Sequence, residues 1–272
     1  MYVNSSTYHG KTSCFGGLRE NYVAARTGRP PELIKKLSEY IGSGPVFDAG
    51  TGTGISAREV ADFNPTVQIV GGDHDPKMLE AAITEEDKRG LGRKKIEYKL
   101  VKVGAHPLNE KGVADLGKKF SLVTAMSCFH WFNKDLALQQ FSSILAPKGH
   151  VAVVSGGGDQ VHRKILEKVV GYAIDHPEMG EQKEELFLRN GFTVVFKGTF
   201  RTCEQVDVER FVKRIKSTSY WTDVQNSHKE AEAEKALRVF FASQANSKGI
   251  MTREKEVFLT IAQKVRKTCF AL

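Results

Sequence analysis

The chain has 272 residues, room for one large domain or two small ones, and its 40 Lys and Arg against 32 Asp and Glu give a formal net charge of +8. Hydrophobic residues make up 40% and charged residues 26% of the chain, a globular composition that excludes wholesale disorder. No segment approaches the ~20 apolar residues of a membrane helix, and no secretory signal opens the chain, so we expect a cytoplasmic protein with no membrane partner. The positive charge leaves nucleic acid and an anionic substrate open as partners.

The sequence shows no repeat, low-complexity tract or Pro/Ser-rich linker, which favours one elaborated domain. Its four cysteines are far apart and form no C-x-x-C pair: Cys14, Cys128, Cys203 and Cys269. We therefore expect no metal site and no disulfide framework, and a reducing compartment suits these thiols.

Strand and helix patterns alternate through the first half of the chain. In chain order they are a helix over 30–41, a strand over 45–48, a helix over 55–63, a strand over 67–72, a helix over 76–90, strands over 96–103 and 120–127, a helix over 134–145 and a strand over 150–156. Such alternation is typical of a mostly parallel, doubly wound α/β sheet with helices on both faces. Further helices are expected over 160–174, 181–190, 204–216 and 228–245, and strands over 191–200 and 254–263, which makes the sheet seven-stranded.

The most informative segment is the glycine-rich turn after the first strand, where residues 46–54 read VFDAGTGTG. A P-loop needs Gly-Lys-Ser/Thr at its end, and here Gly54 is followed by Ile55-Ser56. A dinucleotide fingerprint has glycines at positions 1, 3 and 6, whereas these fall at positions 1, 3 and 5. The turn therefore excludes both of these phosphate-binding loops.

The remaining pattern, D-x-G-x-G-x-G, resembles motif I of the class I S-adenosylmethionine-dependent methyltransferases. Because that cofactor carries an ammonium group and no pyrophosphate, it needs a close backbone and a nearby carboxylate more than an anion cradle. The resemblance implies S-adenosylmethionine as the cofactor, and it implies contacts from the residues of this motif: Asp48, Gly50, Thr51, Gly52 and Gly54.

A second acidic residue supports this interpretation. Asp73 ends the second strand 19 residues after the last glycine of the motif, where an acidic residue reaches ribose hydroxyls in nucleotide-binding α/β folds. His74 and Met78 follow and are candidates to pack on the adenine, although Met78 fits a helix core equally well. Asp75 precedes Pro76 and is expected to cap a helix.

The third strand leads into Gly104-Ala105-His106. Many related enzymes have an acidic or polar residue before that alanine, and Gly104 departs from their pattern. We therefore expect adenine recognition from backbone groups, Ala105 or His106.

The fourth strand ends in Ser127-Cys128-Phe129-His130-Trp131-Phe132. This His-Trp-Phe string resembles the type 11 group of small-molecule methyltransferases, especially the trans-aconitate and related carboxylic-acid methyltransferases. Other matching segments are Tyr22 with Arg26 and Arg29-Pro30, the turn Leu145-Ala146-Pro147-Lys148-Gly149, and Arg214 followed by Ser217-Thr218-Ser219-Tyr220-Trp221. The resemblance covers about residues 20–265, strong in the core and loose after residue 160.

The resemblance implies O-methylation of a small carboxylic acid by in-line displacement at the sulfonium methyl, with His130 and Trp131 at the catalytic position. Tyr22, Arg26 and Ser127 are further candidates for the cofactor site. His130 is either a general base or a group that positions the acceptor. Because a carboxylate is already ionised at pH 7, the positioning role is favoured.

Residues 1–29 are expected to be an N-terminal lid segment, and residues 30–272 a methyltransferase domain with a nucleotide-binding core over about 30–160 and a lid insertion over about 203–250. Aromatic and basic residues are interleaved in these lids: Phe15, Arg19, Tyr22 and Arg26, then Arg210, Arg214, Tyr220 and Trp221. Such a lid suits an anionic acceptor with an apolar part, while ordinary amphipathic helices with solvated charges remain the alternative.

Two other functions compete with this interpretation. The net charge leaves an RNA or protein methyltransferase open, but the longest basic run is Arg93-Lys94-Lys95 and no RNA-binding module is appended, which argues against nucleic acid. A non-catalytic protein that has lost its cofactor is disfavoured by the intact motif and Asp73.

Overall fold

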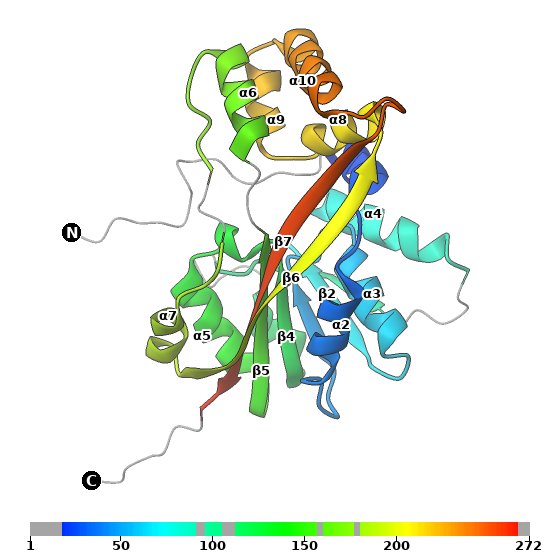
Figure 1. Cartoon of the computed structure of the whole chain (residues 1–272). Helices are drawn as coiled ribbons and strands as arrows, with labels where there is room; N and C mark the ends of the chain where they lie inside the picture. Colours follow the sequence, from blue (N-terminus) through cyan, green and yellow to red (C-terminus); the bar gives the residue numbers. More distant parts are fainter. Residues whose placement is uncertain (1–17, 91–95, 105–111, 157–159, 177–179, 266–272) are drawn as a thin grey trace, which may run out of the picture.

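Figure 1 shows the computed structural model, which describes residues 18–90, 96–104, 112–156, 160–176 and 180–265. A seven-stranded sheet with the order β3-β2-β1-β4-β5-β7-β6 forms its centre. The strands are β1 (Val46–Ala49), β2 (Ile69–Asp73), β3 (Ile96–Leu100), β4 (Phe120–Met126), β5 (Leu145–Gly156), β6 (Phe192–Val206) and β7 (Met251–Lys264). Neighbours among β1 to β5 pair in parallel, and β7 pairs antiparallel to β5 and β6. The predicted mostly parallel, seven-stranded sheet is therefore confirmed.

Helices cover both faces of this sheet. The strand order reverses beside β1, and because crossovers between parallel strands are right-handed, the helices before and after the reversal lie on opposite faces. One face carries α2 (Pro31–Ser38), α3 (Ile55–Phe63) and α4 (Pro76–Asp87). The other carries α5 (Lys134–Ile144), α7 (Glu184–Arg189) and the 3-10 turn η3 (Val113–Leu116). Every residue of β1, β2 and β4 is buried, because helices lie on both sides of these central strands.

Side-chain caps fix where two of these helices begin. Asp75 accepts a hydrogen bond from the amide of Lys77, and Pro76 takes the first position of α4. Asn133 accepts a hydrogen bond from the amide of Leu136 at the start of α5. Both caps satisfy amides that have no partner inside the helix. The predicted capping role of Asp75 is confirmed.

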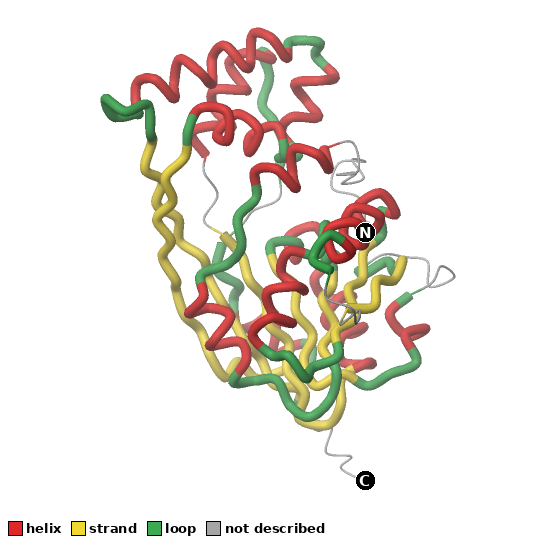
Figure 2. The backbone as a smooth tube through the Cα atoms, turned by 90° about the vertical axis from the view of Figure 1, so that its right-hand side faces the viewer, coloured by secondary structure: helices red, strands yellow, loops and turns green. Residues whose placement is uncertain are grey.

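The last two strands extend beyond the sheet as a two-stranded ribbon (Figures 1 and 2). β5 pairs with β7 between Val257 and Gln263, whereas β6 follows β7 as far as the pair Val206 and Met251. At the tip of the ribbon the chain forms α8 (Val208–Lys216), α9 (Tyr220–Asn226) and α10 (Glu230–Gln244). This arrangement places three helices away from the parallel half of the sheet.

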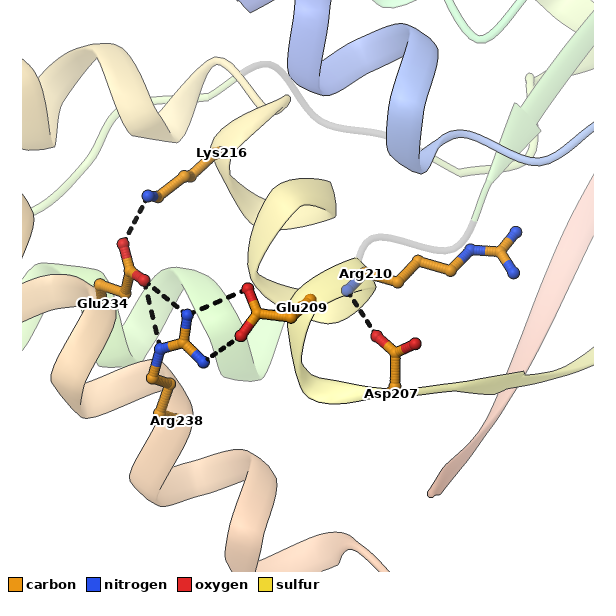
Figure 3. Close-up of polar contacts among 6 residues, drawn as sticks. All are labelled: Asp207, Glu209, Arg210, Lys216, Glu234 and Arg238. Carbon is orange, nitrogen blue, oxygen red and sulfur yellow. Dashed lines mark hydrogen bonds and ion pairs between the residues drawn. The ribbon is translucent and has the colours of Figure 1, made fainter. Parts of the chain in front are cut away.

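These helices form a second hydrophobic core together with α6 (Gln160–Val170), which we call the distal helical cluster. Its fully buried side chains include Leu166, Phe211, Val224 and Leu237. On its surface, Arg238 of α10 pairs with Glu209 of α8 and with Glu234, which also pairs with Lys216 (Figure 3). Apolar burial is the larger stabilising contribution, because exposed ion pairs contribute little.

The structure differs from two sequence predictions in this region. The helix expected over 204–216 begins only at Val208, because Glu204, Gln205 and Val206 pair with β7. Helix α9 was not predicted, because its seven residues are too short for a helical period to stand out, although Tyr220, Trp221 and Val224 are buried.

Candidate active site

The carboxyl ends of β1, β2 and β4 meet where the strand order reverses, and three loops leave the sheet at this edge. Open α/β sheets bind their ligands in the crevice at such a switch point. The loop after β1 carries the glycine motif, the turn after β2 carries His74, and the segment after β4 carries Ser127 and the turn η4 (Phe129–Trp131).

The three glycines of the loop are required by backbone conformation. Their φ angles are 66° at Gly50, 56° at Gly52 and 75° at Gly54, all in the left-handed region that other residues rarely adopt. A Cβ on Gly50 would lie 2.8 Å from Sγ of Cys128, so this glycine also allows β1 and the segment after β4 to approach closely. The motif therefore specifies a particular loop shape.

Asp48 lies behind this loop and is buried. One carboxylate oxygen accepts a hydrogen bond from the hydroxyl of Thr51 at 2.7 Å, and the other accepts one from the hydroxyl of Thr124 at 2.6 Å. Burial raises the pKa of Asp48, while the two hydroxyl groups oppose that increase. In this geometry Asp48 fixes Thr51 and ties the loop to β4.

Asp73 holds the loop from the other side. Its carboxylate accepts hydrogen bonds from the amide of Gly52 at 2.8 Å and from the amide of Asp75 at 3.0 Å, and Nδ1 of His74 lies 3.3 Å from Oδ1. The thioether carbon of Met78 lies 3.4 Å from the position that a Cβ would take on Gly52, and Met78 is also buried in the helix core. The carboxylate is thus fixed at the mouth of the glycine loop.

The segment after β4 completes the edge of the crevice. Ser127 has a φ of 62°, unusual for a residue other than glycine, and its amide donates to the carbonyl of Val154. The thiol of Cys128 donates to the carbonyl of Ala49. Burial raises the pKa of this thiol well above its ordinary value, so Cys128 is not a reactive thiolate.

Arg29 also lies at this edge. In the sequence it was only part of a segment that resembles other methyltransferases, and no role was predicted for it. Its Nη2 donates to the hydroxyl of Ser127 at 3.1 Å and to the carbonyl of Met126 at 3.4 Å. Its backbone amide donates to Glu59, whose carboxylate fills the space beside Gly28. The adjacent Arg29-Pro30 pair, entering a helix, was the only sequence signal for this position.

His130 and Trp131 lie beneath a loop that follows α6. The ring of His176 lies 5.6 Å from the ring of His130 and 5.2 Å from that of Trp131, and the ring of Tyr220 from α9 lies 4.8 Å from His176. Burial, helped by the charges of His176 and Lys134, lowers the pKa of His130 to about 3. His130 is therefore neutral at pH 7. No sequence pattern pointed to His176.

Arg26 and Tyr22 connect the core with the distal helical cluster. They belong to α1 (Arg19–Ala25) and the residue after it, and the guanidinium of Arg26 lies 4.9 Å from the ring centre of Tyr22. Nε of Arg26 donates to the hydroxyl of Ser217 at 3.0 Å, while Arg19 pairs with Glu80 of α4. Helix α1 therefore links α4 to the segment after α8.

Some predicted positions lie outside the described residues, namely Phe15, Ala105 and His106. Within the described part of the chain, no group of three His, Cys, Asp or Glu side chains could hold a metal ion. Among these same residues, no helix has the length and apolar character to cross a membrane.

Comparisons with known proteins bear on the class of protein to which this chain is similar. Residues 46–149 match a family described as a methyltransferase domain. An uncharacterized methyltransferase of Schizosaccharomyces pombe is 25% identical over 212 residues, which cover 73% of this chain and 76% of the relative.

Solved structures show the same fold. A putative methyltransferase from Bacillus halodurans has a TM-score of 0.56 at 18% identity. The superposition covers 88% of this chain and 100% of the Bacillus halodurans chain. Magnesium protoporphyrin IX methyltransferase from Synechocystis with bound S-adenosylhomocysteine has a TM-score of 0.51 at 11% identity, covering 91% of this chain and 94% of that structure.

The chain has the fold of class I methyltransferases. Residues 46–149 match a methyltransferase domain, and the protein is an enzyme that uses S-adenosylmethionine as its cofactor.

Proposed function

We propose that the enzyme transfers the methyl group of S-adenosylmethionine to a carboxylate of a small molecule that also has an apolar part. The observation that supports this acceptor is the combination of rings and cations over the switch point. Trp131 and Tyr220 provide aromatic surface through their contacts with His176, while Arg29 places a guanidinium at the end of β4. Such surroundings favour an apolar anion over a cationic acceptor.

The residues around the glycine loop fit the cofactor. Asp73 presents a fixed carboxylate at the end of β2, suited to the two ribose hydroxyls, and the left-handed glycines allow a ligand close to the backbone. Thr51, held by Asp48, and His74, beside Asp73, line the same loop. Tyr22 and Arg26 are proposed to reach the cofactor from α1. Bound S-adenosylmethionine supplies an electrophilic methyl group on a sulfonium.

The chain's own residues would then align the acceptor and exclude water. A carboxylate is ionised at pH 7 and needs no base, which agrees with the low pKa of His130. Neutral His130 can donate or accept one hydrogen bond and so position the acceptor beside Trp131. The distal helical cluster and α1 would act as the lid, so that most of the rate enhancement comes from alignment in a closed site.

An RNA or protein methyltransferase is the alternative, motivated by the net charge of +8. Phosphate-driven binding weakens steeply as salt increases, so electrophoretic shifts with total RNA at rising salt test for it. A salt-sensitive shift at low micromolar protein would favour this alternative.

The direct test is an assay of a metabolite pool with S-adenosylmethionine labelled in its methyl group, followed by mass analysis of the products. We expect a labelled methyl ester that mild alkali hydrolyses. Label in an alkali-stable amine or ether would contradict carboxylate methylation, and label in RNA or protein alone would contradict a small-molecule acceptor.

A further inference from the structure

A cluster of cations lies where the ribbon, α8 and the segment after α1 meet. Arg214, Arg253 and Lys255 surround the carboxylate of Glu204, and Arg26 lies near enough to Arg214 and Arg253 to interact with their charges. These five residues come from β6, β7, α8 and the segment after α1, so only the folded chain brings them together. Nothing in the proposed methyl transfer or cofactor contacts requires Arg253, Lys255 or Glu204.

Three of the cations converge on one carboxylate oxygen. Arg214 Nη1 lies 3.4 Å and Arg253 Nη1 lies 3.8 Å from Oε1 of Glu204, and Lys255 Nζ pairs with the same atom. The other oxygen of Glu204 accepts a hydrogen bond from the hydroxyl of Thr27. A single carboxylate therefore serves as the shared partner of three cations.

The cluster is shielded from solvent. Side-chain exposure is 8% at Arg253, 15% at Arg214 and 13% at Glu204. Three of these cations share a single oxygen of Glu204 in surroundings that are largely buried. Crowded cations in a buried site repel one another, so this arrangement favours binding of a further negative charge.

The titration of the cluster agrees with an excess of positive charge. Burial and the charges of Arg26 and Arg253 lower the pKa of Arg214 to about 9. Burial and the charges of Arg214 and Arg253 lower the pKa of Lys255 to about 7, despite its pairing with Glu204. Burial acts to raise the pKa of Glu204, but Lys255, Arg214 and Arg253 outweigh it and lower that pKa.

We propose that this cluster is an oxyanion-binding site, which takes a carboxylate or phosphate group beside Glu204. Guanidinium groups suit such ligands because their planar N–H donors match the oxygens of a carboxylate or phosphate. Arg253 is held in place by Phe211, whose ring centre lies 5.9 Å from its guanidinium carbon. The oxyanion belongs either to the methyl acceptor or to a free anion, and both have this chemistry.

Calorimetric titration with inorganic phosphate at constant ionic strength tests the site, with chloride as the reference anion. Lys255→Gln removes a cation, so we expect phosphate affinity to fall by about tenfold. Glu204→Gln removes the resident negative charge, so we expect affinity to rise. Lys248→Gln makes the same charge change at an exposed lysine in the turn before β7, and we expect it to leave the affinity unchanged.

Proton uptake provides a readout that a purely structural cluster would not give. A bound anion raises the pKa of Lys255 from about 7, so binding at pH 8 takes up protons and its enthalpy depends on the buffer. Lys255→Gln is expected to reduce that dependence to the part that comes from the titration of phosphate itself. Equal phosphate affinity in the wild type and both cluster variants, or the absence of phosphate binding by folded wild type, would overturn the proposal.

The labelled-product assay, repeated with added phosphate, shows whether the oxyanion belongs to the methyl acceptor or is a free anion. Product that falls with phosphate in the wild type, but not in Lys255→Gln, assigns the site to the acceptor's own anionic group. Product that stays constant assigns it to a free anion. Calorimetry needs no acceptor, so failure of the carboxylate proposal and failure of the oxyanion site are separate results.

Discussion

Replacing Asp73 with alanine tests the proposed cofactor site most directly. The substitution removes the acceptor of two amide hydrogen bonds, from Gly52 and Asp75. A buried amide left without a partner costs about 1–3 kcal/mol, so we expect the loss of both partners to lower the free energy of unfolding by about 2–6 kcal/mol. If Asp73 also binds two ribose hydroxyls, each charged hydrogen bond contributes about 1.5–3 kcal/mol, and S-adenosylmethionine affinity falls by about 100-fold or more.

Asp75→Ala is the matched control, because it removes a carboxylate two residues away. Its side chain caps α4 through the amide of Lys77, and loss of a cap costs about 0.5–2 kcal/mol. We expect it to lower stability and leave cofactor affinity unchanged. Calorimetric titration with S-adenosylmethionine, at a temperature where denaturant curves show both variants folded, separates a loss of cofactor binding from a loss of stability. Affinities that agree within about threefold would refute the ribose role.

Three further outcomes are expected. His130 is neutral down to about pH 3 in the folded chain but titrates near 6.5 when unfolded, so stability should decrease by about 1–2 kcal/mol from pH 7 to pH 5, and denaturant titrations of His130→Gln should show a smaller decrease. Gly50→Ala should lower the free energy of unfolding by about 1–3 kcal/mol more than Gly52→Ala, since both need a left-handed backbone but only the Cβ on Gly50 meets Cys128; equal losses would contradict this packing. Arg238→Ala should change the midpoint of thermal unfolding little, because the pairs with Glu209 and Glu234 are exposed and contribute less than about 1 kcal/mol; a larger loss would show that this network holds the distal helical cluster together.

The sequence alone determined the features that depend on neighbouring residues. Alternating apolar patterns predicted the strands and helices of the core, because a buried strand or helix face needs apolar residues at fixed spacing. The glycine motif predicted the loop, since Gly50, Gly52 and Gly54 all have left-handed φ angles. Asp75 before Pro76 predicted the start of α4. Each of these signals lies within a few residues of the structure that it specifies.

Tertiary structure decided the roles that depend on contacts between distant segments. The motif identifies Asp48, but only the fold shows its carboxylate buried between the hydroxyls of Thr51 and Thr124. His176 reaches His130 only because the loop after α6 crosses the end of β4.

The cationic cluster is the clearest example of a feature that could not be predicted from the sequence. Its members run from Arg26 to Lys255, and no spacing along the chain relates them. They meet because β6 and β7 continue beyond the sheet and bring Glu204 and Arg253 beneath α8. Charge in the sequence is a sum over the chain, whereas a binding site is a local concentration of charge that only folding creates.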